Sequence, residues 1–180
     1  MMKDNISKRE LHFEKEDAYK SLELVNGWIN NLDTKASFLL AYLAVVLGFV
    51  VSNGRPNLFT QPVPSPMVFG FVVKVICVIA LFLSLTLSIV LFLSTLTARI
   101  KGKEKQHSLF FFGEIASNSL NDYKAKILNR TEEDLIKDVL EQVHTNSIIC
   151  MTKSKCYNAG VKLSLISTGL YVVCMFWNLL

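Results

Sequence analysis

The stretch from Ala36 to Ser52, ASFLLAYLAVVLGFVVS, decides the fold, because it contains no charged side chain. As a helix it reaches the short end of the roughly 17–25 residues that cross a hydrocarbon core of about 30 Å. Two more apolar stretches follow: residues 67–98, with Lys74 as their one charge, and residues 161–180, with Lys162 at the edge. Hydrophobic residues make up 51% of the 180-residue chain and charged residues 19%. The sequence therefore predicts an all-α integral membrane protein with three transmembrane helices.

The distribution of charge predicts the orientation of these helices. Residues 53–66 hold all four prolines and a single cation, Arg55, which is typical of a short external loop. The region from 99 to 162 is rich in cations: Arg99, Lys101, Lys103, Lys105, Lys124, Lys126, Arg130, Lys137, Lys153, Lys155 and Lys162. Loops rich in Lys and Arg stay in the cytoplasm. With three spans, we expect a cytoplasmic N-terminus and an external C-terminus.

Helical periodicity extends beyond the spans and predicts a cytoplasmic helical bundle. Before the first span, apolar residues recur at steps of three and four at Ala18, Leu22, Val25, Ile29, Leu32 and Ala36, as in a helical stalk. Between the second and third spans we expect a helix over 109–128. A second helix starts at the capping box of Thr131 and Asp134 and continues into the third span. The predicted parts are a cytoplasmic stalk (1–35), first span (36–52), external loop (53–66), second span with a cytoplasmic extension (67–98), cytoplasmic helical region (99–160) and third span (161–180).

Signatures of catalysis are not found in the sequence. His12, His107 and His144 have no partners at metal-ligand spacing, and phosphate-cradling glycine loops and G-x-S-x-G patterns are absent. The acidic run 132–134 suits the first turn of a helix, where negative charge offsets the dipole. We therefore expect a protein that is not an enzyme and that uses no metal or cofactor.

The second span carries a face of polar side chains that admits two interpretations. Lys74, Ser84, Ser88 and Thr95 share this face. Small and polar residues let helices approach closely and hydrogen-bond in lipid, so the face could pack inside one three-helix bundle. It could instead meet other copies of the chain or line a path for water and ions.

The basic residues directly after the second span indicate a membrane partner. Arg99, Lys101, Lys103 and Lys105 would attract anionic lipid of the inner leaflet, at about 1 kcal/mol per cation. Basic and aromatic residues do not interleave here, so we expect no nucleic-acid partner.

Polar residues of the cytoplasmic helices form a candidate site for a small anionic ligand such as a nucleotide. Gln142, Asn146 and Lys153 fall on one stripe, which we place across the helix from Val139 and Leu140. Amides can read base edges, a lysine can meet a phosphate and an aromatic ring can stack on a base. The candidate nucleotide-binding set is Asn31, Asp33, Lys35, Phe112, Gln142, Asn146, Lys153 and Tyr157. The alternative is an ordinary solvated face with a lysine anchor at the membrane edge.

Three stretches carry a family resemblance: NNLDTKASFLLAYLAVVLG (30–48), SLFFFGEIA (108–116) and TEEDLIKDVLEQVHTNSII (131–149) with Lys153 after it. In this order they resemble the transmembrane effectors of bacterial Pycsar antiphage systems (PycTM). The resemblance implies a bacterial inner-membrane protein that binds cyclic CMP or cyclic UMP, made by a partner cyclase, on its cytoplasmic part. It then damages the membrane, so that the infected cell stops growing.

We expect such an effector to act as a homo-oligomer. The competing interpretation is a constitutive membrane scaffold or sensor that docks a cytoplasmic protein partner.

Overall fold

The computed structural model describes residues 15–52, 69–97, 108–110 and 112–180. The predictions for the first fourteen residues, the external loop (53–66) and the basic segment 99–107 lie outside these residues.

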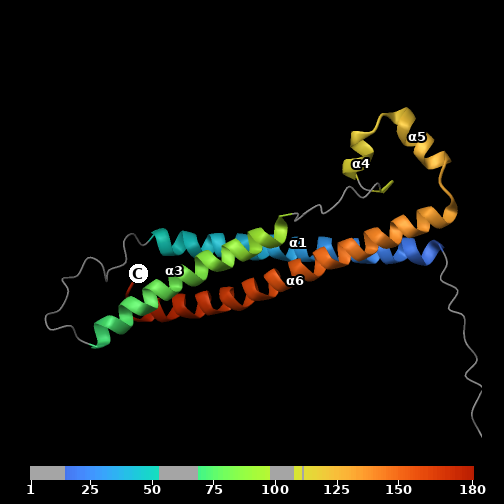
Figure 1. Ribbon diagram of the computed structural model, residues 1–180. Coiled ribbons are helices and arrows are strands. Elements are labelled where there is room, and N and C mark those ends of the chain that lie inside the picture. The colour runs from blue at the N-terminus through green and yellow to red at the C-terminus, as the bar shows by residue number, and fades with distance from the viewer. Residues whose placement is uncertain (1–14, 53–68, 98–107, 111) are drawn as a thin grey trace, which may run out of the picture. The chain divides into compact units, whose positions relative to one another are not determined.

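The described chain consists of five helices (Figure 1). They are α1 (Lys15–Ser52), α3 (Phe69–Leu96), α4 (Phe112–Ser117), α5 (Leu120–Leu128) and α6 (Glu132–Phe176). The described residues contain no strand, and α1, α3 and α6 are each long and apolar enough to cross a membrane. The prediction of an all-α membrane protein with three spanning helices is confirmed.

Helix α1 runs for 38 residues without interruption, and α6 runs for 45 residues. The predicted capping box opens α6: Asp134 accepts hydrogen bonds from the Thr131 backbone N–H (3.1 Å) and hydroxyl (2.8 Å), and its own N–H donates to Thr131 Oγ1 (3.2 Å). These bonds from the Thr131 hydroxyl and backbone lower the pKa of Asp134. The helix ends in a Schellman motif, with Asn178 at φ 49° and the Leu179 N–H bonded to the Cys174 carbonyl.

The prediction of a single helix over 109–128 is wrong, because the chain breaks between α4 and α5. Ser119 adopts an extended backbone (φ −68°, ψ 155°), and its hydroxyl accepts a hydrogen bond from the Asp122 N–H at 3.2 Å. Serine competes for backbone hydrogen bonds within a helix but caps an N-terminus well. Ser119 therefore starts a new helix and does not continue the old one.

The chain divides into two compact units. Unit 1 comprises residues 1–27 and 102–148, and unit 2 comprises residues 28–101 and 149–180. Helices α1 and α6 contribute one segment to each unit, whereas α4 and α5 belong to unit 1 and α3 to unit 2.

Unit 2 is a three-helix bundle with an apolar core. Leu43 of α1 and Leu81, Leu85 and Phe92 of α3 are almost completely buried in it. Large apolar side chains also cover its outside, including Phe38, which is 72% exposed. A helix that is apolar on its outer face as well is suited to lipid and not to water.

Close approach of α3 and α6 in unit 2 depends on Gly160. The buried Ser88 hydroxyl donates to the Gly160 carbonyl at 3.0 Å, and the Phe92 ring lies over the glycine. A Cβ atom at position 160 would lie 2.9 Å from Phe92 Cε1, which is too close for an unstrained contact.

The substitution Gly160→Ala should destabilise unit 2 by about 1–3 kcal/mol, because the added methyl group overpacks against a buried ring. The matched control is Gly169→Ala on the same helix, where nothing lies within 4 Å of the new Cβ. We expect this control to leave stability unchanged or to raise it through better helix propensity. Thermal unfolding in detergent micelles measures both variants, and equal midpoints would contradict the packing argument.

Candidate functional site

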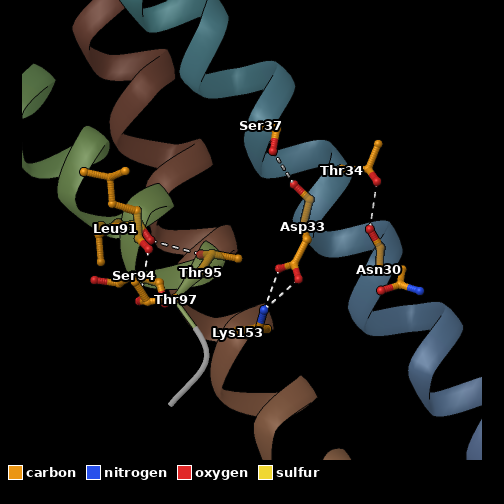
Figure 2. A network of polar contacts seen from close by, with 10 residues as sticks. Asn30, Asp33, Thr34, Ser37, Leu91, Ser94, Thr95, Thr97 and Lys153 are labelled. Carbon is orange, nitrogen blue, oxygen red and sulfur yellow. Dashed lines mark hydrogen bonds and ion pairs between the residues drawn. The ribbon is translucent and has the colours of Figure 1, made fainter. Parts of the chain in front are cut away.

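A partly buried ion pair joins α1 to α6 in unit 2. Lys153 Nζ lies 2.6 Å from Asp33 Oδ1 and 2.8 Å from Oδ2 (Figure 2). The Lys153 side chain is only 8% exposed, and that of Asp33 is 32% exposed. A buried ammonium group is costly unless it is paired, so each partner depends on the other.

Two predicted ligand-binding residues of α1 do not join this pair. Asn31 and Lys35 are both exposed. The Ser37 hydroxyl donates to the backbone carbonyl of Asp33 at 2.9 Å, so it does not compete with Lys153 for the Asp33 carboxylate.

A second polar contact between α1 and α6 lies in unit 1. Asn146 Nδ2 donates to Asn26 Oδ1 at 2.9 Å. Asn26 and Asp33 are seven residues apart on α1, and Asn146 and Lys153 are seven residues apart on α6. Polar residues at buried heptad positions fix the register of paired helices at some cost in stability, and Lys153 occupies such a position, whereas Asn26 is exposed.

The heptad on α6 corrects the predicted stripe. Counting in steps of seven from Val139 reaches Asn146, Lys153, Gly160, Ser167 and Cys174, and each of these residues is buried or half-buried. The assignment of Asn146 and Lys153 to the side opposite Val139 is therefore wrong, because a seven-residue step returns to nearly the same face. Gln142 is half-buried one turn before Asn146.

The remaining predicted ligand residues are aromatic. The Tyr157 ring packs at a tilt against Phe92, with 6.1 Å between the ring centroids. The side chain of Phe112 lies outside the described part of the chain. Among the described residues of the predicted set, the structure brings together Asp33 and Lys153. Both carboxylate oxygens of Asp33 accept hydrogen bonds from the Lys153 ammonium group.

The hydroxyl groups of the α3 face are engaged inside unit 2. Ser84 Oγ accepts from Ser167 at 3.0 Å, Ser88 donates to Gly160, and Thr95 donates to the Leu91 carbonyl at 3.0 Å. All three side chains are buried, whereas Lys74 is exposed.

A polar hollow of about 460 Å³ lies along α5 in unit 1. The residues that line it are Asn118, Asp122, Ala125, Lys126, Asn129 and Arg130. Four of them, at 118, 122, 126 and 130, recur at steps of four, which is a sequence signal for one polar helix face. The predicted ligand set did not include this face, because a single polar helix face is usually only a solvated one.

Hydrogen bonds connect α5 to α6 within unit 1. The Tyr123 hydroxyl donates to the Leu109 carbonyl at 3.1 Å, and the Leu109 N–H donates to Asp138 Oδ2 at 2.7 Å. Asp138 is only 6% exposed, so this contact is buried. One backbone residue, Leu109, thus joins the two helices.

The fold and these contacts define a multi-span helical membrane protein. Its longest helix, α6, contributes to both unit 1 and unit 2. The comparisons with known proteins give the family: the family described as Pycsar effector protein domain (PycTM) matches residues 17–180. The chain therefore belongs to the Pycsar effector family of antiphage defence.

Two curated relatives agree with this assignment. The chain is similar to the Pycsar effector protein GmPycTM of Gulbenkiania mobilis, at 29% identity over 88% of this chain and 90% of the relative. It is also similar to the Pycsar effector protein PtPycTM of Propioniciclava tarda, at 24% identity over 89% of this chain and 76% of the relative. No solved structure matches.

Removal of Asp33 tests the buried pair. Asp33→Ala should destabilise unit 2 near the low end of the roughly 3–5 kcal/mol that breaking a buried pair costs, because Lys153 is left without its counter-charge. The double variant Asp33→Ala/Lys153→Met removes both charges and should lose less stability than Asp33→Ala alone. Thermal unfolding in detergent micelles measures the difference.

The control for this cycle is the exposed pair of Glu16 and Lys20, with 3.7 Å between the charged atoms and both side chains at least 68% exposed. Glu16→Ala should cost less than about 1 kcal/mol. The single variant Lys153→Met completes the cycle. If the stability lost in the double variant equals the sum of the losses in Asp33→Ala and Lys153→Met, the two side chains do not depend on each other.

Proposed function

We propose that this effector binds a cyclic pyrimidine mononucleotide, of the cyclic CMP or cyclic UMP class, and then impairs the integrity of the bacterial inner membrane. Unit 1 lies in the cytoplasm and receives the nucleotide from a partner cyclase. The predicted spans of unit 2 (36–52, 67–98 and 161–180) lie in the bilayer, with the C-terminus external. The observation that carries the proposal is the family match from residue 17 to residue 180, which covers the described residues of both units except positions 15 and 16.

The continuity of α6 supports coupling between the two units. Because α6 contributes to both, a ligand that favours one arrangement of its first turns acts on the same helix that crosses the membrane. A ligand shifts such an equilibrium only by its differential affinity for the two arrangements.

The residues at seven-residue steps along α6 (139, 146, 153, 160, 167 and 174), here called the heptad seam, make a second packing arrangement of α6 accessible. Asn146, Lys153 and Ser167 occupy seam positions where apolar residues would be more stabilising. Polar pairs of this kind specify a register at a cost in stability, so the resting arrangement is held by few and specific contacts.

Membrane damage requires more than one copy of the chain in this proposal. The described helices of unit 2 pack an apolar core that contains Leu43, Leu81 and Phe92, and such a core is unsuited to carry ions. Several copies, rearranged so that the hydroxyl groups of Ser84, Ser88 and Ser167 exchange partners, would expose a polar surface to one another.

The test uses full-length protein reconstituted into liposomes of anionic lipid loaded with a self-quenched dye. Cyclic CMP, cyclic UMP, cyclic AMP and cyclic GMP are added separately, with linear 5′-CMP as the matched control. We expect at least one cyclic pyrimidine nucleotide to release dye and linear 5′-CMP to release none. The proposal fails if no cyclic nucleotide causes leakage and none binds.

A further inference from the structure

We infer that the ion pair of Asp33 and Lys153 is an autoinhibitory contact. By neutralising Lys153, Asp33 holds α1 and α6 in the arrangement that keeps the membrane intact, and the pair separates when the effector acts. This inference deepens the proposed function and rests on it for the leakage that follows. Figure 2 shows the two side chains pointing toward each other from α1 and α6.

The charge composition of unit 2 gives Lys153 a single acidic partner. Asp33 is the one acidic residue in the sequence of residues 28–101 and 149–180. The same ranges contain eight basic residues: Lys35, Arg55, Lys74, Arg99, Lys101, Lys153, Lys155 and Lys162. If the Asp33 carboxylate is withdrawn, unit 2 therefore has no second carboxylate that could neutralise the Lys153 ammonium group.

The two partners differ in exposure, and this difference determines what happens when the pair separates. The Asp33 side chain is partly exposed, so water can hydrate its carboxylate in place of Lys153. The Lys153 side chain is buried, and a charge in such a position is costly to leave unpaired. Separation of the pair therefore favours a position of α6 in which water reaches the Lys153 ammonium group.

Movement of α6 at Lys153 also affects its packing against α3. Gly160 follows one heptad later on the same uninterrupted helix, where its carbonyl accepts a hydrogen bond from Ser88 and the Phe92 ring lies over it. Closely packed interiors transmit strain because they have little free volume. Opening of the ion pair therefore disturbs the contact of α3 with α6 inside unit 2.

The first experiment measures dye release from liposomes of anionic lipid, without nucleotide, by the unchanged protein and by Asp33→Asn. This substitution keeps the size of the side chain and removes its charge. We expect Asp33→Asn to release dye at least about tenfold faster, because the arrangement that buries an unpaired Lys153 is strongly disfavoured. Added cyclic nucleotide should then raise its release by less than about twofold, since the contact is already open.

The double variant Asp33→Asn/Lys153→Met tests whether the charge of Lys153 is the cause. Methionine is an unbranched side chain that fits an apolar position, so the buried site no longer contains a charge. Dye release without nucleotide should return to within about twofold of the unchanged protein, because no buried charge is left unpaired. Release by the double variant as fast as by Asp33→Asn would overturn the inference.

Two controls separate this role from general damage to the protein. Glu16→Gln makes the same kind of change in the exposed pair with Lys20 on α1. Leu43→Ala weakens the core of unit 2 but leaves both charges of the ion pair in place. Neither control should release dye without nucleotide, and circular dichroism verifies that all variants keep their helix content. Release by Leu43→Ala as fast as by Asp33→Asn would show that any weakening of the bundle causes leakage, and the inference would be wrong.

Chemical labelling of the unchanged protein tests the opening without any substitution. An amine-acetylating reagent modifies lysines that water reaches, and mass spectrometry measures acetylation of Lys153 relative to Lys155, which is exposed on the same helix. With the cyclic nucleotide that releases dye, we expect this ratio to rise at least about fivefold, as the population shifts toward the open arrangement. An unchanged ratio in leaking liposomes would contradict the inference.

The outcomes distinguish failure of this inference from failure of the proposed function. If a cyclic pyrimidine nucleotide releases dye through the unchanged protein, but Asp33→Asn retains its dye without nucleotide, the inference is overturned and the proposed function stands. If Asp33→Asn leaks and both controls do not, while no cyclic nucleotide binds or acts on the unchanged protein, the autoinhibitory contact is supported and the proposed ligand is wrong.

Discussion

The pairing of Lys153 with Asp33 ties α1 to α6 in unit 2 through opposite charges. The Lys153 side chain is only 8% exposed, so its ammonium group needs a counter-ion, and the two Asp33 carboxylate oxygens at 2.6 and 2.8 Å provide it. Replacement of such a pair by apolar residues often stabilises a protein. Its presence beside an apolar core therefore suits a role in fixing a particular arrangement of α1 and α6 more than a role in raising stability.

A second polar contact lies one heptad earlier, where the exposed Asn26 meets the half-buried Asn146. Both contacts join α1 to α6, and beyond them the α6 seam passes through Gly160, Ser167 and Cys174, which are small. Small residues allow close approach of α3, as the contact of Gly160 with Phe92 shows. The long helix α6 thus combines polar contacts that set register with small residues that set distance, and it does so in both units without a break.

Much of the fold could be predicted from sequence, because each feature depends on local pattern. The three apolar stretches, the stalk continuous with the first span and the Thr131–Asp134 capping box are all set by composition and spacing along the chain. The break at Ser119 was missed, since a serine inside a periodic stretch is compatible with either a helix interior or a cap. Which one occurs depends on the contacts of α4 and α5 with the rest of unit 1.

The candidate site was harder to predict, because the sequence of one helix does not show which residues of a distant helix it will contact. Asp33 and Lys153 were both expected to be functional, but not to neutralise each other across 120 positions of sequence.

The proposed function implies that nucleotide binding rearranges α6 against its partner helix α1, and pulsed electron spin resonance tests this most directly. Spin labels are placed on cysteines introduced at the exposed positions 35 and 155, after the native Cys77, Cys150, Cys156 and Cys174 are replaced. Without nucleotide, the account predicts one narrow distance distribution. With the cyclic nucleotide that releases dye from liposomes, it predicts a shifted or second distribution, and an unchanged distribution in leaking liposomes would contradict it.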